Sequence, residues 1–247
     1  MAGEFSGQVA VVTGAARGLG KAVAALIAER GGQVILLDID REAVEETAAA
    51  FKERGLGASA ACVDAANEEE LAALKADIEE EFGRLDVLVN NAGGWRYGTA
   101  SEITMPDWDW TFRTNVTAPF QTTRVLMDLM TARRYGRIVN VASTDAYRPK
   151  PKLPHYAAAK AAVVSLTRSL AEELAPHQVI VNAVSPGAIA TETAKGQGWL
   201  EERAKSIPLG RVAEPEDIAE IILFLASKRN RFVVGETVIA NGGMLMI

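Results

Sequence analysis

Cysteine is almost absent from this chain, since Cys62 is the only one among 247 residues. A single cysteine cannot form an internal disulfide, and we therefore expect a reducing compartment. Histidine is nearly as scarce, with only His155 and His177. Because no group of histidines is available as ligands, the sequence predicts no catalytic metal site.

The chain also lacks a surplus of basic residues and any long apolar run. Its 26 lysines and arginines are outnumbered by 32 aspartates and glutamates, which gives a formal net charge of −6. That balance argues against nucleic acid or an anionic membrane as the main partner. No stretch has the apolar length needed to cross a bilayer, and the first six residues lack the pattern of a signal peptide. We therefore expect a cytoplasmic protein.

No linker rich in proline, glycine or serine divides the chain, and no internal repeat is present. The composition, 49% hydrophobic and 23% charged, is that of a globular protein with a substantial core. We expect a single domain over residues 1–247.

Short apolar runs alternate with helical patterns along the chain. In the helical pattern at Glu68–Phe82, for example, Leu71, Leu74 and Ile78 fall on one stripe. This alternation predicts an α/β fold with a doubly wound parallel sheet of about seven strands, covered by helices on both faces. The expected strands are 8–13, 34–37, 58–63, 86–90, 137–142, 179–184 and 237–240.

The first expected strand runs into a glycine-rich turn at 13–20, which contains Gly14, Gly18 and Gly20. Such a turn presents backbone N–H groups at a helix N-terminus, where a pyrophosphate binds. Glycine is needed there because a Cβ atom blocks close approach of the phosphates. Tight turns between a strand and a helix also use glycine for structural reasons alone, so this motif is a weak indication by itself.

The second expected strand ends at Asp38, 18 positions beyond Gly20. An acid near this offset accepts hydrogen bonds from the ribose hydroxyls of NAD and repels the 2′-phosphate of NADP. Arg17 argues the other way, because a cation in the glycine-rich turn can hold that phosphate. Asp40 is better placed than Asp38 to cap the next helix. We therefore give Asp38 more weight and predict NAD as the coenzyme.

Tyr156 and Lys160 stand four positions apart in a helix expected from Pro154 to about Ala175, so they share one face. An ammonium beside a phenol stabilises the phenolate, which suits a group that exchanges a proton near neutral pH. Ser143 follows the fifth expected strand, and a Pro-rich loop can bring its hydroxyl over the same cleft as Tyr156. The alternatives are a turn serine and a solvated helix face, where tyrosine and lysine at this spacing are also common.

Asn115 and Pro119 lie in a helix expected to start near Pro106. Proline has no N–H for the carbonyl four residues back, so the carbonyl of Asn115 is expected to be free, with a kinked helix and an ordered water bound there. Further along, the irregular segment 188–208 is expected to act as a lid over the substrate.

In their order and spacing, these motifs resemble the short-chain dehydrogenase/reductase family in its compact branch. Each motif occurs often by chance, whereas the ordered set is specific. The resemblance spans Gly7 to Met246 and rests on the turn at 13–20, Asn90-Asn91-Ala92-Gly93, Asn115, Ser143, Tyr156 with Lys160, and Pro186-Gly187.

The resemblance implies a role for each matching residue. Tyr156 is similar to the catalytic acid/base of the family, and Ser143 to the residue that orients the substrate oxygen. Lys160 resembles the residue that holds the nicotinamide ribose and lowers the pKa of the tyrosine, and Asn115 the one that positions a water between that lysine and solvent. The implied coenzyme-binding residues are Gly14, Arg17, Gly18, Leu19, Asp38, Asp64, Ala65, Asn91, Ala92, Gly93, Tyr156, Lys160, Pro186, Gly187, Ile189 and Thr191.

By resemblance, the chain is expected to be an NAD(H)-dependent oxidoreductase that interconverts a secondary alcohol and a ketone by direct hydride transfer. Homotetramers are expected to form through the helices of Trp108 and Tyr156. One alternative is an NADPH-dependent 3-ketoacyl-[acyl-carrier-protein] reductase, because the ending 241–246 and the basic stretch around Arg134 resemble that group. Those enzymes generally lack an acid at the position of Asp38. A third possibility is a dinucleotide sensor, which has no use for the complete catalytic set.

The substrate itself is not predictable from the fold. Four aromatic residues are candidates for an apolar lining, and three cations are candidates for contact with a substrate carboxylate, although all are equally consistent with surface loops. They are Trp95, Tyr97, Tyr147 and Trp199, and Arg96, Arg148 and Lys152.

Overall fold

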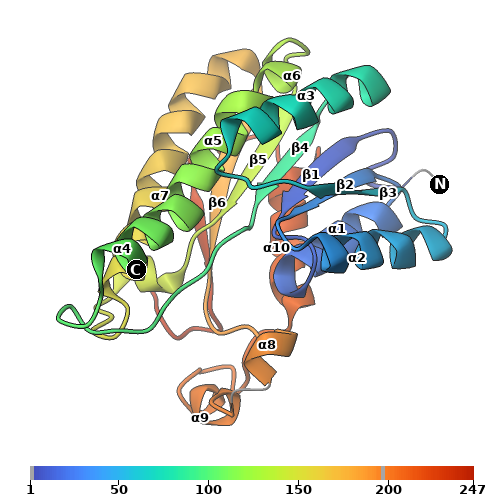
Figure 1. Ribbon diagram of the computed structural model, residues 1–247. Coiled ribbons are helices and arrows are strands. Elements are labelled where there is room, and N and C mark those ends of the chain that lie inside the picture. The colour runs from blue at the N-terminus through green and yellow to red at the C-terminus, as the bar shows by residue number, and fades with distance from the viewer. Residues whose placement is uncertain (1–2, 196–197) are drawn as a thin grey trace.

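The computed structural model describes residues 3–195 and 198–247. A seven-stranded sheet forms the centre of the domain, in the order β3-β2-β1-β4-β5-β6-β7. Every strand pair is parallel, and helices cover both faces of the sheet (Figure 1). The predicted doubly wound α/β fold is therefore confirmed.

The expected strands agree with the observed ones to within two residues at each end. The strands are β1 (Val9–Thr13), β2 (Gln33–Asp38), β3 (Ala58–Cys62), β4 (Val87–Asn90), β5 (Gly136–Val141), β6 (Val179–Pro186) and β7 (Thr237–Ala240). The α-helices are α1 (Gly18–Glu29), α2 (Arg41–Glu53), α3 (Glu68–Phe82), α4 (Met105–Phe112), α5 (Ala118–Leu126), α6 (Asp128–Thr131), α7 (Pro154–Leu174), α8 (Glu192–Lys195), α9 (Leu200–Lys205) and α10 (Pro215–Ala226).

Alternate residues of β1 pack into the two opposite cores of the domain. Ala10 and Val12 belong to a core with residues of α1, α2 and α10, whereas Val9 and Val11 belong to a core with residues of α3, α5 and α7. Successive side chains of a strand point to opposite faces of a sheet. Because helices cover both faces, β1 is apolar from Val9 to Val12 rather than alternating with polar residues.

The chain reverses direction across the sheet at β1, since β2 and β3 lie on one side of β1 and β4 to β7 on the other. Open α/β sheets bind ligands outside the carboxyl ends of the strands at such a reversal. The segments after β1 and β4 are joined there by Asn91, whose Nδ2 donates to the carbonyls of Thr13 and Gly14 at 2.9 and 3.0 Å. Thr13 Oγ1 in turn accepts the Ala92 N–H at 2.9 Å. These bonds hold together two loops that form the binding cleft.

The helix that carries Asn115 differs from the expected one. A π-helical segment, Arg113–Thr117, separates α4 from α5, and Pro119 lies in the first turn of α5, where proline is well tolerated. The wide π-turn thus accommodates the proline within one continuous helical region, because such bulges replace the regular i to i−4 pattern. An ordered water on the Asn115 carbonyl stays a prediction.

The segment 188–208 contains the short helices α8 and α9, which lie below the body of the molecule in Figure 1. Residues 196 and 197 of this segment lie outside the described residues. A bridge between Ile189 and Ala213 ties its start to the main body. Its function as a lid stays a prediction. In the part of the chain that the structure describes, no helix is long and apolar enough to span a bilayer.

Candidate active site

A cleft of about 1190 Å³ lies at the carboxyl ends of the strands. Every predicted coenzyme-binding residue lines it, and so does Ser143. Asn115 is the one predicted site residue that is not part of the lining. A pocket for one small ligand measures roughly 300–1,000 Å³, so the cleft has room for a second ligand beside a dinucleotide.

The glycine-rich turn has the geometry that a pyrophosphate needs. Gly14 and Gly18 have φ angles of 63° and 56°, in the left-handed region that glycine favours. A Cβ at Gly14 would lie 2.9 Å from the Ala92 Cα, and a Cβ at Gly20 would lie 2.1 Å from the Gly14 carbonyl oxygen. These contacts exclude any larger residue, because the neighbouring atoms belong to the backbone.

The N-terminus of α1 is not capped by the side chain of its own N-cap residue. The side chain of Arg17, the N-cap residue, makes no hydrogen bond to the N–H groups of the first turn. By contrast, the side chains of Asp40 and Asn67 cap α2 and α3. The N–H groups of an uncapped first turn bind anionic oxygens. Glu192 of α8 already places a carboxylate oxygen 3.4 Å from the Gly18 nitrogen. The turn therefore fits the phosphates of a dinucleotide.

At the adenosine end of the cleft, Asp38 faces the glycine-rich turn. Its Oδ2 accepts the Ala16 N–H and its Oδ1 the Asp40 N–H, both at 3.1 Å. Arg17, the cation that argued for NADP, forms an ion pair with Asp40. Asp40 also accepts the Ala43 N–H as the cap of α2, as predicted. This end thus presents two carboxylates beside one paired cation.

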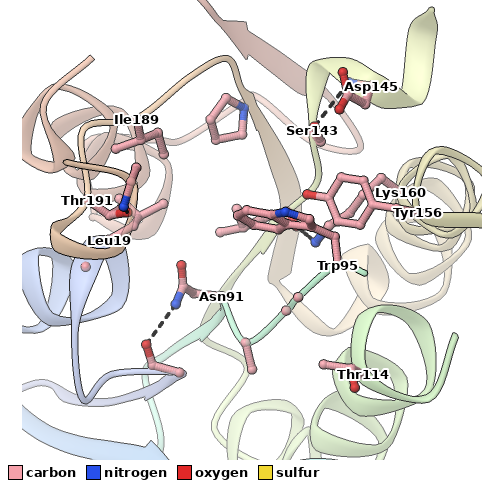
Figure 2. A pocket seen from close by; sticks show the side chains of 18 of the residues that line it. Leu19, Asn91, Trp95, Thr114, Ser143, Asp145, Tyr156, Lys160, Ile189 and Thr191 are labelled. Atoms are coloured by element: carbon pink, nitrogen blue, oxygen red, sulfur yellow. Dashed lines mark hydrogen bonds between the residues drawn. The ribbon is translucent and has the colours of Figure 1, made fainter. Parts of the chain in front are cut away.

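Other walls of the cleft come from the segments that follow β3 and β6. Asp64 and Ala65 follow β3, and Asp64 pairs with Arg113 of the π-helical segment at 2.8 Å. Figure 2 shows Leu19, Ile189 and Thr191 together on one side of the pocket, across from Tyr156. On the floor, a Cβ at Gly187 would lie 2.9 Å from the Asn241 Cβ, so the close approach of these loops needs glycine.

Ser143, Tyr156 and Lys160 converge on the other side of the pocket (Figure 2). Ser143 Oγ accepts the Asp145 N–H at 3.1 Å, which leaves the serine proton for another acceptor. Lys160 Nζ donates to the Val141 carbonyl at 2.8 Å and lies 5.7 Å from the centre of the Tyr156 ring. This arrangement agrees with the prediction that the hydroxyls of Ser143 and Tyr156 lie over the same cleft.

Removal from water is the main influence on the pKa values of this group. It raises the pKa of Tyr156, while a hydrogen bond with Ser143 lowers that pKa and the charge of Asp145 raises it. Burial also lowers the pKa of Lys160 from its usual 10.5 to about 8. The expected lowering of the tyrosine pKa by Lys160 is not met in this structure. The lysine bonds to the Val141 carbonyl instead of the phenol, and desolvation of the phenol prevails.

Asn115 lies behind the cleft and holds one of its loops. Its side chain is fully buried; Nδ2 donates to the carbonyls of Gly94 and Thr111 at 2.8 and 2.9 Å, and Oδ1 accepts the Gly94 N–H at 3.3 Å. A Cβ at Gly93 would lie 2.8 Å from Asn115 Oδ1 and 3.3 Å from Lys160 Nζ. Asn115 therefore acts as a positioning residue for the loop next to Lys160, and its part in a water chain stays a prediction.

The structure separates the substrate-binding candidates into two groups. Trp95, Tyr97, Arg148 and Trp199 line the cleft, and the ring of Trp95 stands edge-on to Tyr156 with centroids 5.9 Å apart. The other three lie elsewhere. Arg96 packs over the Trp110 ring and pairs with Asp107, Tyr147 packs against Val163 and Val164, and Lys152 is exposed outside the cleft lining.

Several lining residues were missed by the sequence analysis. The most relevant are Asp145 and Lys150, which come from the loop between Ser143 and Tyr156. The sequence does contain a signal that could have indicated them. The loop joins two proposed catalytic residues, and in it an acid is followed by two cations that stand two positions apart. The others include Ile39, Trp110, Arg113, Arg203 and Met244.

The fold and the cleft together define a dinucleotide-dependent oxidoreductase, and comparisons with known proteins agree. A family model described as "Enoyl-(Acyl carrier protein) reductase" matches residues 14–245. A 3-oxoacyl-[acyl-carrier-protein] reductase of Vibrio cholerae is 37% identical over 245 residues, 98% of this chain and 99% of that protein. An NAD-dependent glycerol dehydrogenase of Listeria innocua is 38% identical over 240 residues, 96% of this chain and 93% of that protein.

Among solved structures, a short-chain type dehydrogenase/reductase from Mycobacterium marinum superimposes with a TM-score of 0.93 at 31% identity, covering 99% of this chain and 98% of that one. The chain therefore belongs to the short-chain dehydrogenase/reductase family, as its motifs predicted. It is an oxidoreductase that acts on CH–OH groups with a nicotinamide dinucleotide as coenzyme.

Proposed function

We propose that this chain interconverts a 3-oxoacyl thioester and the corresponding 3-hydroxyacyl thioester, with NAD(H) as coenzyme. The observation that carries the proposal is the convergence of Ser143, Tyr156 and Lys160 at one end of a cleft that has an uncapped helix N-terminus at the other. The Vibrio cholerae relative, whose name specifies a 3-oxoacyl substrate, supports the thioester. This relative therefore favours the 3-ketoacyl reductase, the alternative given by the sequence analysis, over a general alcohol dehydrogenase.

When bound, the nicotinamide supplies the hydride in reduction and accepts it in oxidation. Tyr156 donates its phenolic proton to the substrate oxygen as the carbonyl becomes an alcohol, and it accepts that proton in the reverse direction. Ser143 donates a hydrogen bond to the same oxygen, since its own Oγ already accepts the Asp145 N–H. Lys160, with its pKa lowered to about 8, exchanges protons near neutral pH and offsets the charge that develops on the phenol.

The choice of NAD(H) rests on Asp38. Its oxygens accept two backbone N–H groups, and a carboxylate has further lone pairs for the ribose hydroxyls. A 2′-phosphate would meet the like charges of Asp38 and Asp40, while Arg17 is held by Asp40. Two carboxylates close to one phosphate disfavour its binding. This supports NAD(H) even though 3-ketoacyl reductases generally prefer NADPH.

A second candidate is an NAD-linked dehydrogenase of a small polar alcohol. Its support comes from the Listeria innocua relative and from the charged side chains of Asp145, Arg148 and Lys150 at the substrate end. A dinucleotide sensor is less well supported, because binding alone gives no use to the Ser143, Tyr156 and Lys160 group.

Initial rates with acetoacetyl-CoA and with glycerol test these proposals. We expect NADH-dependent reduction of acetoacetyl-CoA, with kcat/KM for NADH at least tenfold above that for NADPH. Oxidation of glycerol with NAD, without reduction of the thioester, would favour the second candidate. Binding of NADH, followed by fluorescence, without turnover of either compound would overturn the enzyme assignment in favour of a sensor.

We also propose a homotetramer. Trp108 and Phe120, on α4 and α5, are 38% and 41% exposed, and Trp108 stacks on Phe112 with ring centroids 4.8 Å apart. Exposed aromatic side chains of this kind support a subunit interface on this face rather than a core role. Light scattering at micromolar concentration tests the proposal, and a monomer there would contradict it.

A further inference from the structure

Two cations share one carboxylate at the substrate end of the cleft. Arg148 Nε lies 3.1 Å from Asp145 Oδ1, and Lys150 Nζ lies 3.2 Å from Oδ1 and 3.1 Å from Oδ2 of the same residue. All three residues line the cleft. The cluster is next to the chemistry, since Asp145 donates its N–H to Ser143 Oγ, as Figure 2 shows, and its charge acts on Tyr156.

This cluster carries one positive charge more than Asp145 neutralises. The side chains of Arg148 and Lys150 are only 27% and 23% exposed. Partly burying a charge without a partner is unfavourable. Among the described residues, Arg148 makes this contact only through Nε, so the two terminal nitrogens of its planar guanidinium remain available for a planar anion.

No other acid of the cleft neutralises this excess in the part of the chain that the structure describes. Each of the remaining acidic lining residues has a different partner. Asp38 bonds to the N–H groups of Ala16 and Asp40, Asp40 pairs with Arg17, Asp64 with Arg113, Glu202 with Lys205, and Glu192 bonds to the Gly18 N–H. Arg203 of α9 adds a further cation to the lining. The substrate end is thus positive while the adenosine end is negative.

We propose that Arg148 and Lys150 bind a free carboxylate of the substrate, beside the oxygen that Ser143 and Tyr156 hold. The substrate class is then an oxo acid, in which the acyl part of the thioester carries a carboxylate in addition to the reacting carbonyl. This proposal rests on the proposed function for the position of the reacting oxygen. Binding of a carboxylate can be measured without turnover, so the two can fail separately.

The test compares an acid with its neutral ester. Monomethyl 3-oxoglutarate, in which one ester stands for the thioester and the other end is a free carboxylate, and dimethyl 3-oxoglutarate are titrated into the protein with saturating NAD, which cannot reduce them. Binding is followed by the fluorescence of tryptophan, since Trp95 stands next to Tyr156. We expect the monomethyl ester to bind at least tenfold more tightly than the diester. Equal binding of the two compounds to the wild-type protein would overturn the proposal.

Variants then locate the charge that is responsible. Arg148→Ala and Lys150→Ala are each expected to weaken binding of the monomethyl ester about tenfold. Binding of the diester and of NAD should stay unchanged, which also shows that the variants are folded. Lys152→Ala is the matched control, because it removes the same charge from the same loop but outside the cleft lining. An equal loss in Lys152→Ala would show a general charge effect and contradict a specific site.

Asp145→Asn distinguishes binding from a purely structural role of the two cations. If Arg148 and Lys150 bind substrate, the carboxylate of Asp145 competes with it, and Asp145→Asn should tighten binding of the monomethyl ester several-fold. If the cations only neutralise Asp145, the variant should bind the monomethyl ester no more tightly, which would count against the proposal. Retained acid preference without reduction of acetoacetyl-CoA would instead refute the proposed function and leave this inference standing.

Discussion

The two ends of the cleft are constructed in different ways. The coenzyme end is formed largely by backbone, with Gly14, Gly18 and Gly93 at positions where a Cβ would strain the chain or meet its neighbours. The substrate end is formed by long side chains, with Asp145, Arg148 and Lys150 gathered from a single loop beside Ser143.

This difference indicates which changes each end tolerates. A backbone cradle depends on the absence of side chains, so it binds the part of the ligand that every member of a coenzyme class shares. A set of charged side chains selects by charge and reach, so it can be changed without rebuilding the sheet. We therefore expect substitutions at the two ends to affect different kinetic quantities.

Tyr156→Phe should give the largest effect, because Tyr156 stands at the boundary between the two ends. Loss of the phenolic proton should lower kcat about 10²- to 10⁴-fold, the range for removal of a general acid. The affinity for NADH should change no more than a few-fold, since the ring and the neighbouring Lys160 remain. Acetoacetyl-CoA reduction and NADH fluorescence measure the two quantities. A parallel loss of NADH affinity would contradict the assignment of Tyr156 as proton donor.

The fold was predictable because the information is local. The apolar runs that become β1 to β7 alternate with helical patterns, and the helix at Glu68–Phe82 has its predicted bounds. The coenzyme end was predictable for the same reason, since residues such as Gly14 and Asp38 directly follow or end a strand. Spacing along the chain and position around the sheet edge then correspond closely.

The substrate end and the electrostatics were not predictable, because they depend on neighbours that meet only in space. The bond from Lys160 Nζ to the Val141 carbonyl joins α7 to β5, and no spacing rule indicates it. Proximity of Tyr156 and Lys160 suggested a lowered tyrosine pKa, but sequence does not report how much water the cleft excludes. The double pairing of Arg148 and Lys150 with Asp145 likewise depends on how one irregular loop folds.

Asp38→Ala tests the coenzyme end. Hydrogen bonds to a charged group contribute about 1.5–3 kcal/mol, so the preference for NADH over NADPH should narrow by about 10- to 100-fold in kcat/KM. Asp128→Ala is a suitable control, because it removes an exposed acid that pairs with Lys75 far from the cleft lining. An unchanged ratio would show that Asp38 serves only the N–H groups of Ala16 and Asp40.

The smallest expected effect concerns stability and comes from the burial of Lys160 between the two ends. Its pKa is about 8 in the folded protein, against 10.5 when exposed. Below pH 8 both the folded and the unfolded chain bind the proton, and the buried charge costs about 3 kcal/mol. Between pH 8 and 10.5 only the unfolded chain binds it, so the wild-type protein should gain stability as the pH rises.

Lys160→Met removes this cost. It also leaves the Val141 carbonyl without its donor, and this loss offsets about 1 kcal/mol of the gain in stability. The variant should therefore be more stable than the wild type by about 2 kcal/mol at pH 7, although it loses activity. That advantage should disappear as the pH approaches 10, because the wild-type lysine is then neutral in the folded state. Urea unfolding of both proteins at pH 7 and pH 10 gives the difference directly. A variant that is less stable than the wild type at pH 7 would contradict this prediction. It would mean that the Lys160 ammonium is solvated or paired, so that water reaches the region between the two ends of the cleft.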